Sequence, residues 1–161
     1  MDLRAAGERL DELGELRSLS ALNEKMTLLR LLGRLDEAID VANQAVRQAR
    51  FTGNREDLVT SRIRRAQVMQ YQGKLDEAQL ELGACVELAE THEWARIAGC
   101  ARQHRGQVHF EQGKLERALV DFTAAVFLRE QSGASAALLE ASLMAVAVTE
   151  SFLDEQRNPK P

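Results

Sequence analysis

The sequence is poor in residues that interrupt helices or build strands. Its two prolines, Pro159 and Pro161, both lie in the last three of the 161 residues. Proline breaks helices, so no break of this kind precedes residue 159. Aromatic residues make up only 4% of the chain, and no long stretch shows the period-two alternation of strands. Helix-favouring Leu, Ala, Glu, Arg and Gln are abundant, and the composition therefore predicts an all-α fold.

Other absences narrow the class of protein. The two cysteines, Cys85 and Cys100, are too few for a disulfide scaffold of this length. The 21 basic and 25 acidic residues are interspersed and give a net charge of −4, which argues against a nucleic-acid partner. No apolar run approaches the roughly 18 residues that span a bilayer, and the amino terminus lacks the features of a secretion signal. We therefore expect a cytoplasmic protein with neither a membrane nor a nucleic-acid partner.

What the chain does contain is a repeat of 40 residues. The segments GRLDEA, GKLDEA and GKLERA recur at this spacing without insertion, at 33–38, 73–78 and 113–118. A fixed period of this size is typical of a solenoid, in which copies of one supersecondary unit stack. In each copy a glycine is expected to end one helix in the left-handed conformation. Acidic residues then begin the next helix, where they face the positive end of its dipole.

The apolar spacing predicts helices throughout one domain, residues 1–154. A lead helix is expected at 2–13 and ends at Gly14. Three helical pairs follow, at 18–32 with 35–49, at 55–72 with 75–90 after an Asn54 cap, and at 93–112 with 115–130. They define repeats at 18–52, 54–92 and 93–133. A last helix at 135–154 precedes a frayed tail at 155–161. That helix is apolar on most sides, so it either packs against more than the third pair or forms a dimer surface.

The glycine and alanine spacing resembles the tetratricopeptide repeat (TPR). That family has a small residue in the first helix, a glycine at the turn, an alanine five residues on, then an aromatic and a second alanine. The third copy fits best, with Gly106, Gly113, Ala118, Phe122 and Ala125. The other two copies keep the glycine and the first alanine but have Leu82 and Ala42 at the aromatic position. The family's tryptophan and closing proline are absent.

The period of 40 residues exceeds the usual TPR length of about 34. It resembles the long-repeat subclass seen in kinesin light chains and in bacterial regulatory proteins. The resemblance implies a right-handed α-α superhelix of three helical hairpins, flanked by single N- and C-terminal helices. A HEAT-type array is the alternative, and the glycine-to-alanine spacing argues against it.

The resemblance also implies a binding site, because first helices of TPR proteins line a concave groove that holds peptides. The register assigns to this groove Asn23, Thr27, Arg64, Gln67, Tyr71, Gln103, His104, Gln107 and Phe110. Amide side chains can donate to and accept from a peptide backbone, and an arginine can hold a carboxylate through two hydrogen bonds. The alternative interpretation is a merely solvated polar face. The carboxylate clamp of chaperone-binding members is incomplete, so chaperone tails are not expected.

No catalytic motif accompanies this groove, since nucleophile, phosphate-loop and HExxH patterns are all missing. Cys100 and His104 have a spacing that suits zinc but lack further ligands, so neither metal nor cofactor is predicted. His109 is expected at a helix interface, and the Arg62–Arg65 run is expected to pair with nearby acids such as Asp57 and Asp76. The predicted function is a non-enzymatic scaffold for a peptide or protein partner. The alternatives are a homodimeric self-association module that uses the apolar terminal helices, and a regulatory subunit of a larger signalling or transcription system.

Overall fold

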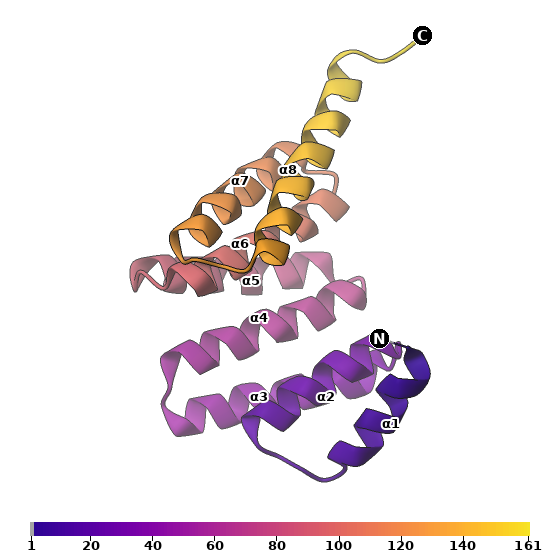
Figure 1. The fold of residues 1–161 in the computed structure, drawn as a ribbon, viewed down its shortest axis with the longest axis vertical. Coiled ribbons are helices and arrows are strands. Elements are labelled where there is room, and N and C mark those ends of the chain that lie inside the picture. Colours follow the sequence, from indigo (N-terminus) through magenta and orange to yellow (C-terminus); the bar gives the residue numbers. More distant parts are fainter. Residues whose placement is uncertain (1) are drawn as a thin grey trace. The chain divides into compact units, whose positions relative to one another are not determined.

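The computed structural model describes residues 2–161, which form eight α-helices and no strand (Figure 1). The fold is thus all-helical, as predicted. Its helices are α1 (Leu3–Leu13), α2 (Leu19–Leu31), α3 (Leu35–Thr52), α4 (Arg55–Tyr71), α5 (Leu75–Thr91), α6 (Ala95–Glu111), α7 (Leu115–Gln131) and α8 (Ala136–Arg157). They fall into two compact units, Met1–Lys74 and Leu75–Pro161, and each unit is described by itself.

In the first unit, α3 packs against both α2 and α4, and α1 lies on α2. The main core cluster is formed by Leu22, Met26 and Leu29 of α2, Val68 of α4, and three alanines of α3 that are fully buried. Alanine at these positions lets the helix axes approach closely, because it adds little volume between them. The predicted cap of α4 is confirmed, since the Asn54 side chain accepts a hydrogen bond from the Asp57 amide at 3.0 Å.

In the second unit, α6 packs against α5 and α7, and α8 packs against α7. A close approach joins the small residue of the repeat pattern in α6 to its aromatic residue in α7. A Cβ atom at Gly106 of α6 would lie 2.7 Å from two ring carbons of Phe122 in α7. The ring therefore rests directly on the α6 backbone, and only glycine leaves room for it there.

The turns repeat with the same period as the helices. Within the pairs, Gly33, Gly73 and Gly113 have φ angles of 72°, 78° and 76°, which confirms the left-handed conformation predicted for them. Between the pairs, the equivalent positions are Gly53, Glu93 and Gly133. Glu93 has φ 57° and is the only non-glycine residue with positive φ among residues 2–161. Because of this left-handed turn, α6 begins at Ala95, two residues after its predicted start.

The last helix differs from the prediction in its length and in its mean hydropathy. α8 runs to Arg157, so its final turn includes residues expected in the frayed tail. Its 18-residue apolar window has a mean hydropathy of 1.6, and 17% of that window is buried. The expectation that no segment is apolar enough to span a bilayer is therefore corrected: by length and composition alone α8 could. Glu140 and Glu150 interrupt the apolar run but leave the average high.

Candidate functional site

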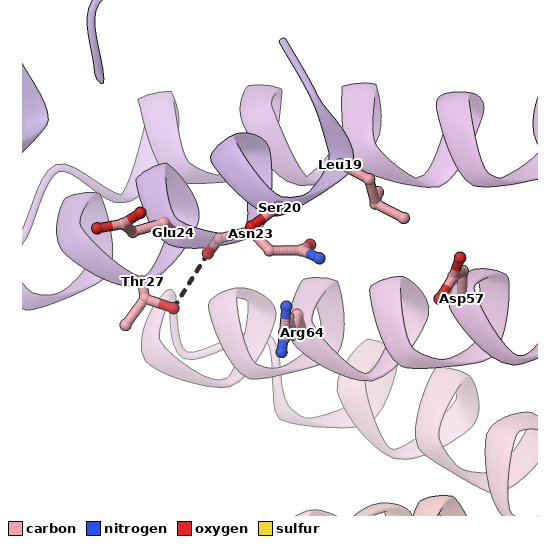
Figure 2. Close-up of a pocket in the computed structure, with 7 residues that line it drawn as sticks. All are labelled: Leu19, Ser20, Asn23, Glu24, Thr27, Asp57 and Arg64. Carbon is pink, nitrogen blue, oxygen red and sulfur yellow. Dashed lines mark hydrogen bonds between the residues drawn. The ribbon is translucent and has the colours of Figure 1, made fainter. Parts of the chain in front are cut away.

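The first unit has an open groove between α2 and α4, with a volume of about 490 Å³ (Figure 2). The residues that line it are Leu19, Ser20, Asn23, Glu24, Thr27, Asp57 and Arg64. Three of them, Asn23, Thr27 and Arg64, are predicted groove residues, and the structure brings these three together. Leu19 and Asp57 were not assigned to the groove from the sequence. Asp57 lies two helical turns before Arg64, so helical periodicity places both on one face of α4.

The side chain of Asn23 lines this groove, and the protein itself does not use its oxygen. Figure 2 shows its amide extending from α2 toward α4, on the side where the Arg64 side chain enters. The Asn23 Oδ1 atom is buried and has no hydrogen-bond partner. The hydroxyl of Thr27, one turn further along α2, donates to the Asn23 backbone carbonyl at 3.2 Å. A buried acceptor without a donor is uncommon in folded proteins, and a bound peptide N–H is the kind of group that would satisfy it.

Arg64 and Asp57 carry the charges of the groove, because the other carboxylate of its lining, Glu24, is already engaged. Glu24 accepts from Arg9 of α1 through two hydrogen bonds, of 2.6 Å and 3.2 Å. These bonds hold the pKa of Glu24 below its usual value. Arg64 forms no ion pair within the described part of the first unit. The groove thus carries a half-buried guanidinium whose donors remain available to a carboxylate.

The other predicted residues of α4 lie outside this groove. Gln67 is half-buried and follows Arg64 by one turn of the helix. Tyr71, at the end of α4, is 59% exposed. Its ring lies under the guanidinium of Arg30 from α2, with the guanidinium carbon 4.9 Å from the ring centroid. This cation–π contact fixes the ring at the surface, where one face remains open to a partner.

In the second unit, α8 covers part of the predicted groove face. Gln103 is only 4% exposed, and its Oε1 accepts from the Ser142 hydroxyl of α8 at 2.7 Å. The Ser142 oxygen in turn accepts from Nη1 of Arg129 in α7 at 2.8 Å. Burial lowers the pKa of this guanidinium. The assignment of Gln103 to an open groove is therefore corrected, because its amide belongs to a buried contact among α6, α7 and α8.

The remaining predicted residues of α6 border α8 or bond to one another. Nδ1 of His104 lies 3.2 Å from Oε1 of Gln107, one turn along the same helix. Phe110 meets Phe152 of α8 edge-on, with ring centroids 5.4 Å apart and an interplanar angle of 83°. All three predicted residues are half-buried. In this unit, any partner on the first-helix face would meet α8 as well as α6.

The basic residues of α6 converge on a buried carboxylate that sequence reasoning missed. Asp121 of α7 is 1% exposed. It accepts from Arg105 at 2.8 Å and 2.9 Å and from Arg102 at 3.0 Å. Arg102 also donates to Glu90 at 2.7 Å, and this bond is the main reason that its pKa is raised. Asp121 was not predicted because it is distant in sequence from these arginines. Its ion pairs hold α6 against its neighbours, so the cluster is not an open anion site.

His109 lies beside this cluster, at the helix interface where the sequence placed it. Its Nε2 is 3.6 Å from the Asp121 carboxylate, and the residue is 5% exposed. Burial lowers the pKa of the imidazole, against the opposing attraction of Asp121. Within residues 2–161, no group of three or more His, Cys, Asp or Glu side chains is arranged to hold a metal ion.

Comparison with known proteins agrees with this geometry. Residues 17–91 match the tetratricopeptide repeat family, which covers the first two copies of the 40-residue repeat. Among the solved structures that are similar is the crystal structure of BtubC (BKLC) from P. vanneervenii, at 14% sequence identity and a TM-score of 0.62. The alignment covers 97% of this chain and 73% of that chain. No curated protein sequence matches.

These likenesses agree on the fold. The chain has an all-helical fold that is consistent with a TPR-type arrangement of helical pairs, and BtubC has the same fold. The family match rests on the two copies that include α2 and α4, the helices that form the groove of the first unit. TPR repeats are generally protein-interaction scaffolds and are typically non-enzymatic.

Proposed function

We propose that this chain binds an extended, acid-bearing segment of a partner protein in the groove between α2 and α4. The single observation that carries the proposal is that one groove contains two polar groups that have no partner within the protein itself. Asn23 offers a buried acceptor without a donor, and Arg64 offers a guanidinium without a carboxylate in its unit. A peptide supplies both complements, since its backbone donates N–H groups and an aspartate or glutamate side chain accepts from arginine.

The shape of the groove also suits a chain segment better than a small molecule. It is open along the two helices, and its lining is polar apart from Leu19. Small-molecule sites are usually enclosed and mostly apolar. Thr27 borders Asn23 one turn along α2, and Gln67 follows Arg64 one turn along α4. A segment that lies along the helices would pass all four residues.

The proposal is tested with a pool of labelled extended peptides that carry aspartate or glutamate, and with the same pool after those acids are replaced by lysine. Fluorescence anisotropy reports binding to the full chain. Arg64→Glu replaces an attractive charge with a repulsive one. Loss of a charged hydrogen bond is worth about 1.5–3 kcal/mol, so we expect the affinity for the acidic pool to fall about tenfold or more.

The matched control is Arg96→Glu, which makes the same charge change at an exposed residue of α6 outside the groove. It should leave binding of the acidic pool unchanged, and both variants should melt close to the wild type. Equal binding of the acidic and lysine pools would refute the proposal. So would an equal loss of binding in the two variants, since this would show a response to net charge alone.

A further inference from the structure

The groove between α2 and α4 carries two opposite charges that the chain does not pair with each other. Asp57 and Arg64 both line it, and among residues 2–74 neither side chain forms an ion pair. The third charged residue of the lining, Glu24, is held by Arg9. One carboxylate and one guanidinium therefore remain available to a partner in the same open groove.

The sequence of α4 keeps these two charges apart. Arg64 follows Asp57 by seven residues, so both lie on one face of the helix, about 10 Å apart along its axis. An ion pair within a helix needs a spacing of three or four residues. At those distances after Asp57 the chain has Thr60 and Ser61, and the same two residues precede Arg64. Neither charge therefore has an opposite charge at helical spacing between them.

The two ends of the groove also differ in their surroundings. Figure 2 shows the Leu19 side chain extending toward the part of α4 that carries Asp57, while the Asn23 amide extends toward Arg64. An apolar side chain near a carboxylate suits a lysine or arginine, whose methylene stem packs on apolar surface while its charge reaches the acid. An amide near a guanidinium suits an acidic side chain and the N–H groups of its backbone.

The separation of the two charges fits an extended chain with a particular spacing. A polyproline II segment rises about 3.1 Å per residue and completes a turn every three residues. Side chains three residues apart then lie on one side of the segment, about 9 Å from each other. In a β-strand, side chains on one face repeat every two residues, at separations of about 7 Å and 13 Å. The three-residue spacing is the nearest match to the separation of about 10 Å along α4.

We propose that the groove selects an extended segment in which an acidic and a basic residue are three positions apart. This proposal rests on the function proposed above, and it makes Asp57 a specificity-determining residue. The acid binds Arg64 beside Asn23. The base binds Asp57, with its stem on Leu19. A segment that carries only acids leaves Asp57 without a partner and binds less tightly.

The experiment uses the full chain and five labelled peptides of one proline- and serine-rich background. Two peptides carry glutamate and lysine three residues apart, one in each order, and a third has the same two residues adjacent. A fourth carries glutamate alone, and a fifth carries lysine alone. Fluorescence anisotropy is measured near physiological salt, where exposed charges more than about 8 Å apart are largely screened. Exposed ion pairs are weak, so we expect the better-bound spaced peptide to bind about two- to fivefold more tightly than the adjacent or glutamate-only peptide.

Variants of α4 test the role of Asp57. Asp57→Asn removes the charge and keeps the shape, so the preference for the spaced peptide should disappear. Asp57→Lys should reverse it, so that the glutamate-only peptide binds more tightly. Glu56→Lys is the matched control, because it makes the same change of net charge in the same helical turn, but Glu56 does not line the groove. This control should keep the wild-type preference.

The proposal is overturned if the wild type binds neither spaced peptide more tightly than the glutamate-only peptide. It is also overturned if Asp57→Asn leaves the preference intact, or if Glu56→Lys reverses it as Asp57→Lys does. In each of these cases the groove function still stands when the glutamate-only peptide binds and Arg64→Glu abolishes that binding. If the glutamate-only peptide binds no more tightly than the lysine-only peptide, the groove function fails and this proposal fails with it. The two failures are therefore distinguishable.

Discussion

The contact between Gly106 and Phe122 allows the sharpest test of the packing in the second unit. The change Gly106→Ala adds one methyl group in the middle of α6. That carbon would lie 2.7 Å from Cδ1 and Cε1 of Phe122 and 3.2 Å from Cζ. Non-bonded carbons prefer about 3.5–4.0 Å. Phe122 is 3% exposed, so its ring cannot swing into solvent to relieve the overlap.

The magnitude follows from two opposing effects. Overpacking of a well-packed core costs about 1–3 kcal/mol. Replacing glycine with alanine inside a helix returns about 0.5–1 kcal/mol. We therefore expect Gly106→Ala to lower the free energy of unfolding by about 0.5–2 kcal/mol, measured by urea denaturation monitored by circular dichroism.

Gly83→Ala provides the matched control in the same unit. A Cβ at Gly83 would meet only the Arg105 Nη1 atom, at an ordinary 3.8 Å, so this change should be stabilising. Adding Phe122→Leu to Gly106→Ala recreates the alanine–leucine combination that the repeat has at Ala66 and Leu82. The double variant should be less destabilised than the sum of the two single changes. The reasoning is refuted if Gly106→Ala is neutral, or stabilises as much as Gly83→Ala.

Three further predictions concern residues outside the proposed binding groove. Glu93→Gly relieves a left-handed conformation at φ 57° and should raise the free energy of unfolding by about 1 kcal/mol in urea titrations; a loss of stability would contradict this reading of the turn. Asp121→Asn leaves Arg102 and Arg105 facing a neutral amide and should destabilise the chain by about 3 kcal/mol, whereas Glu116→Gln in the exposed first turn of α7 should have little effect. Burial lowers the pKa of His109 in the folded state, so its contribution is present above the unfolded-state pKa of about 6.5 and is lost as the pH falls below it. The variant His109→Met, which has the residue found at position 69, should therefore lose less stability than the wild type between about pH 7 and pH 5, and parallel profiles would show that His109 titrates alike in both states.

The repeat predicted the fold well because each local signal agreed with the others. The glycines at 33, 73 and 113 are left-handed, and Asn54 caps α4 as the sequence indicated. The deviations lie at helix ends. α3 continues to Thr52, three residues beyond the expected end, since the chain stays helical up to the left-handed Gly53. The left-handed turn at Glu93 was not predicted, because glutamate stands at a position where the other copies have glycine.

The candidate site was less predictable because burial depends on contacts that are distant in sequence. Gln103 has a polar side chain on the first-helix face, which indicates exposure. It is nevertheless buried, since Ser142 and Arg129 satisfy the amide from two other helices. The sequence also did not predict which face of α8 is buried, because α8 is apolar on most sides and its apolar spacing does not favour one face. Asn23, Thr27 and Arg64 share a groove, yet binding of a partner there remains a prediction.

The most direct test of the account asks where a bound partner lies. A photoreactive residue is placed at Thr27, on the wall of the groove, and in a second protein at Phe51, which is 95% exposed near the end of α3. Each protein is irradiated with the acidic peptide pool. The account predicts a crosslink from position 27 that Arg64→Glu abolishes, and none from position 51. Equal crosslinking from the two positions, or crosslinking at position 27 that survives Arg64→Glu, would contradict it.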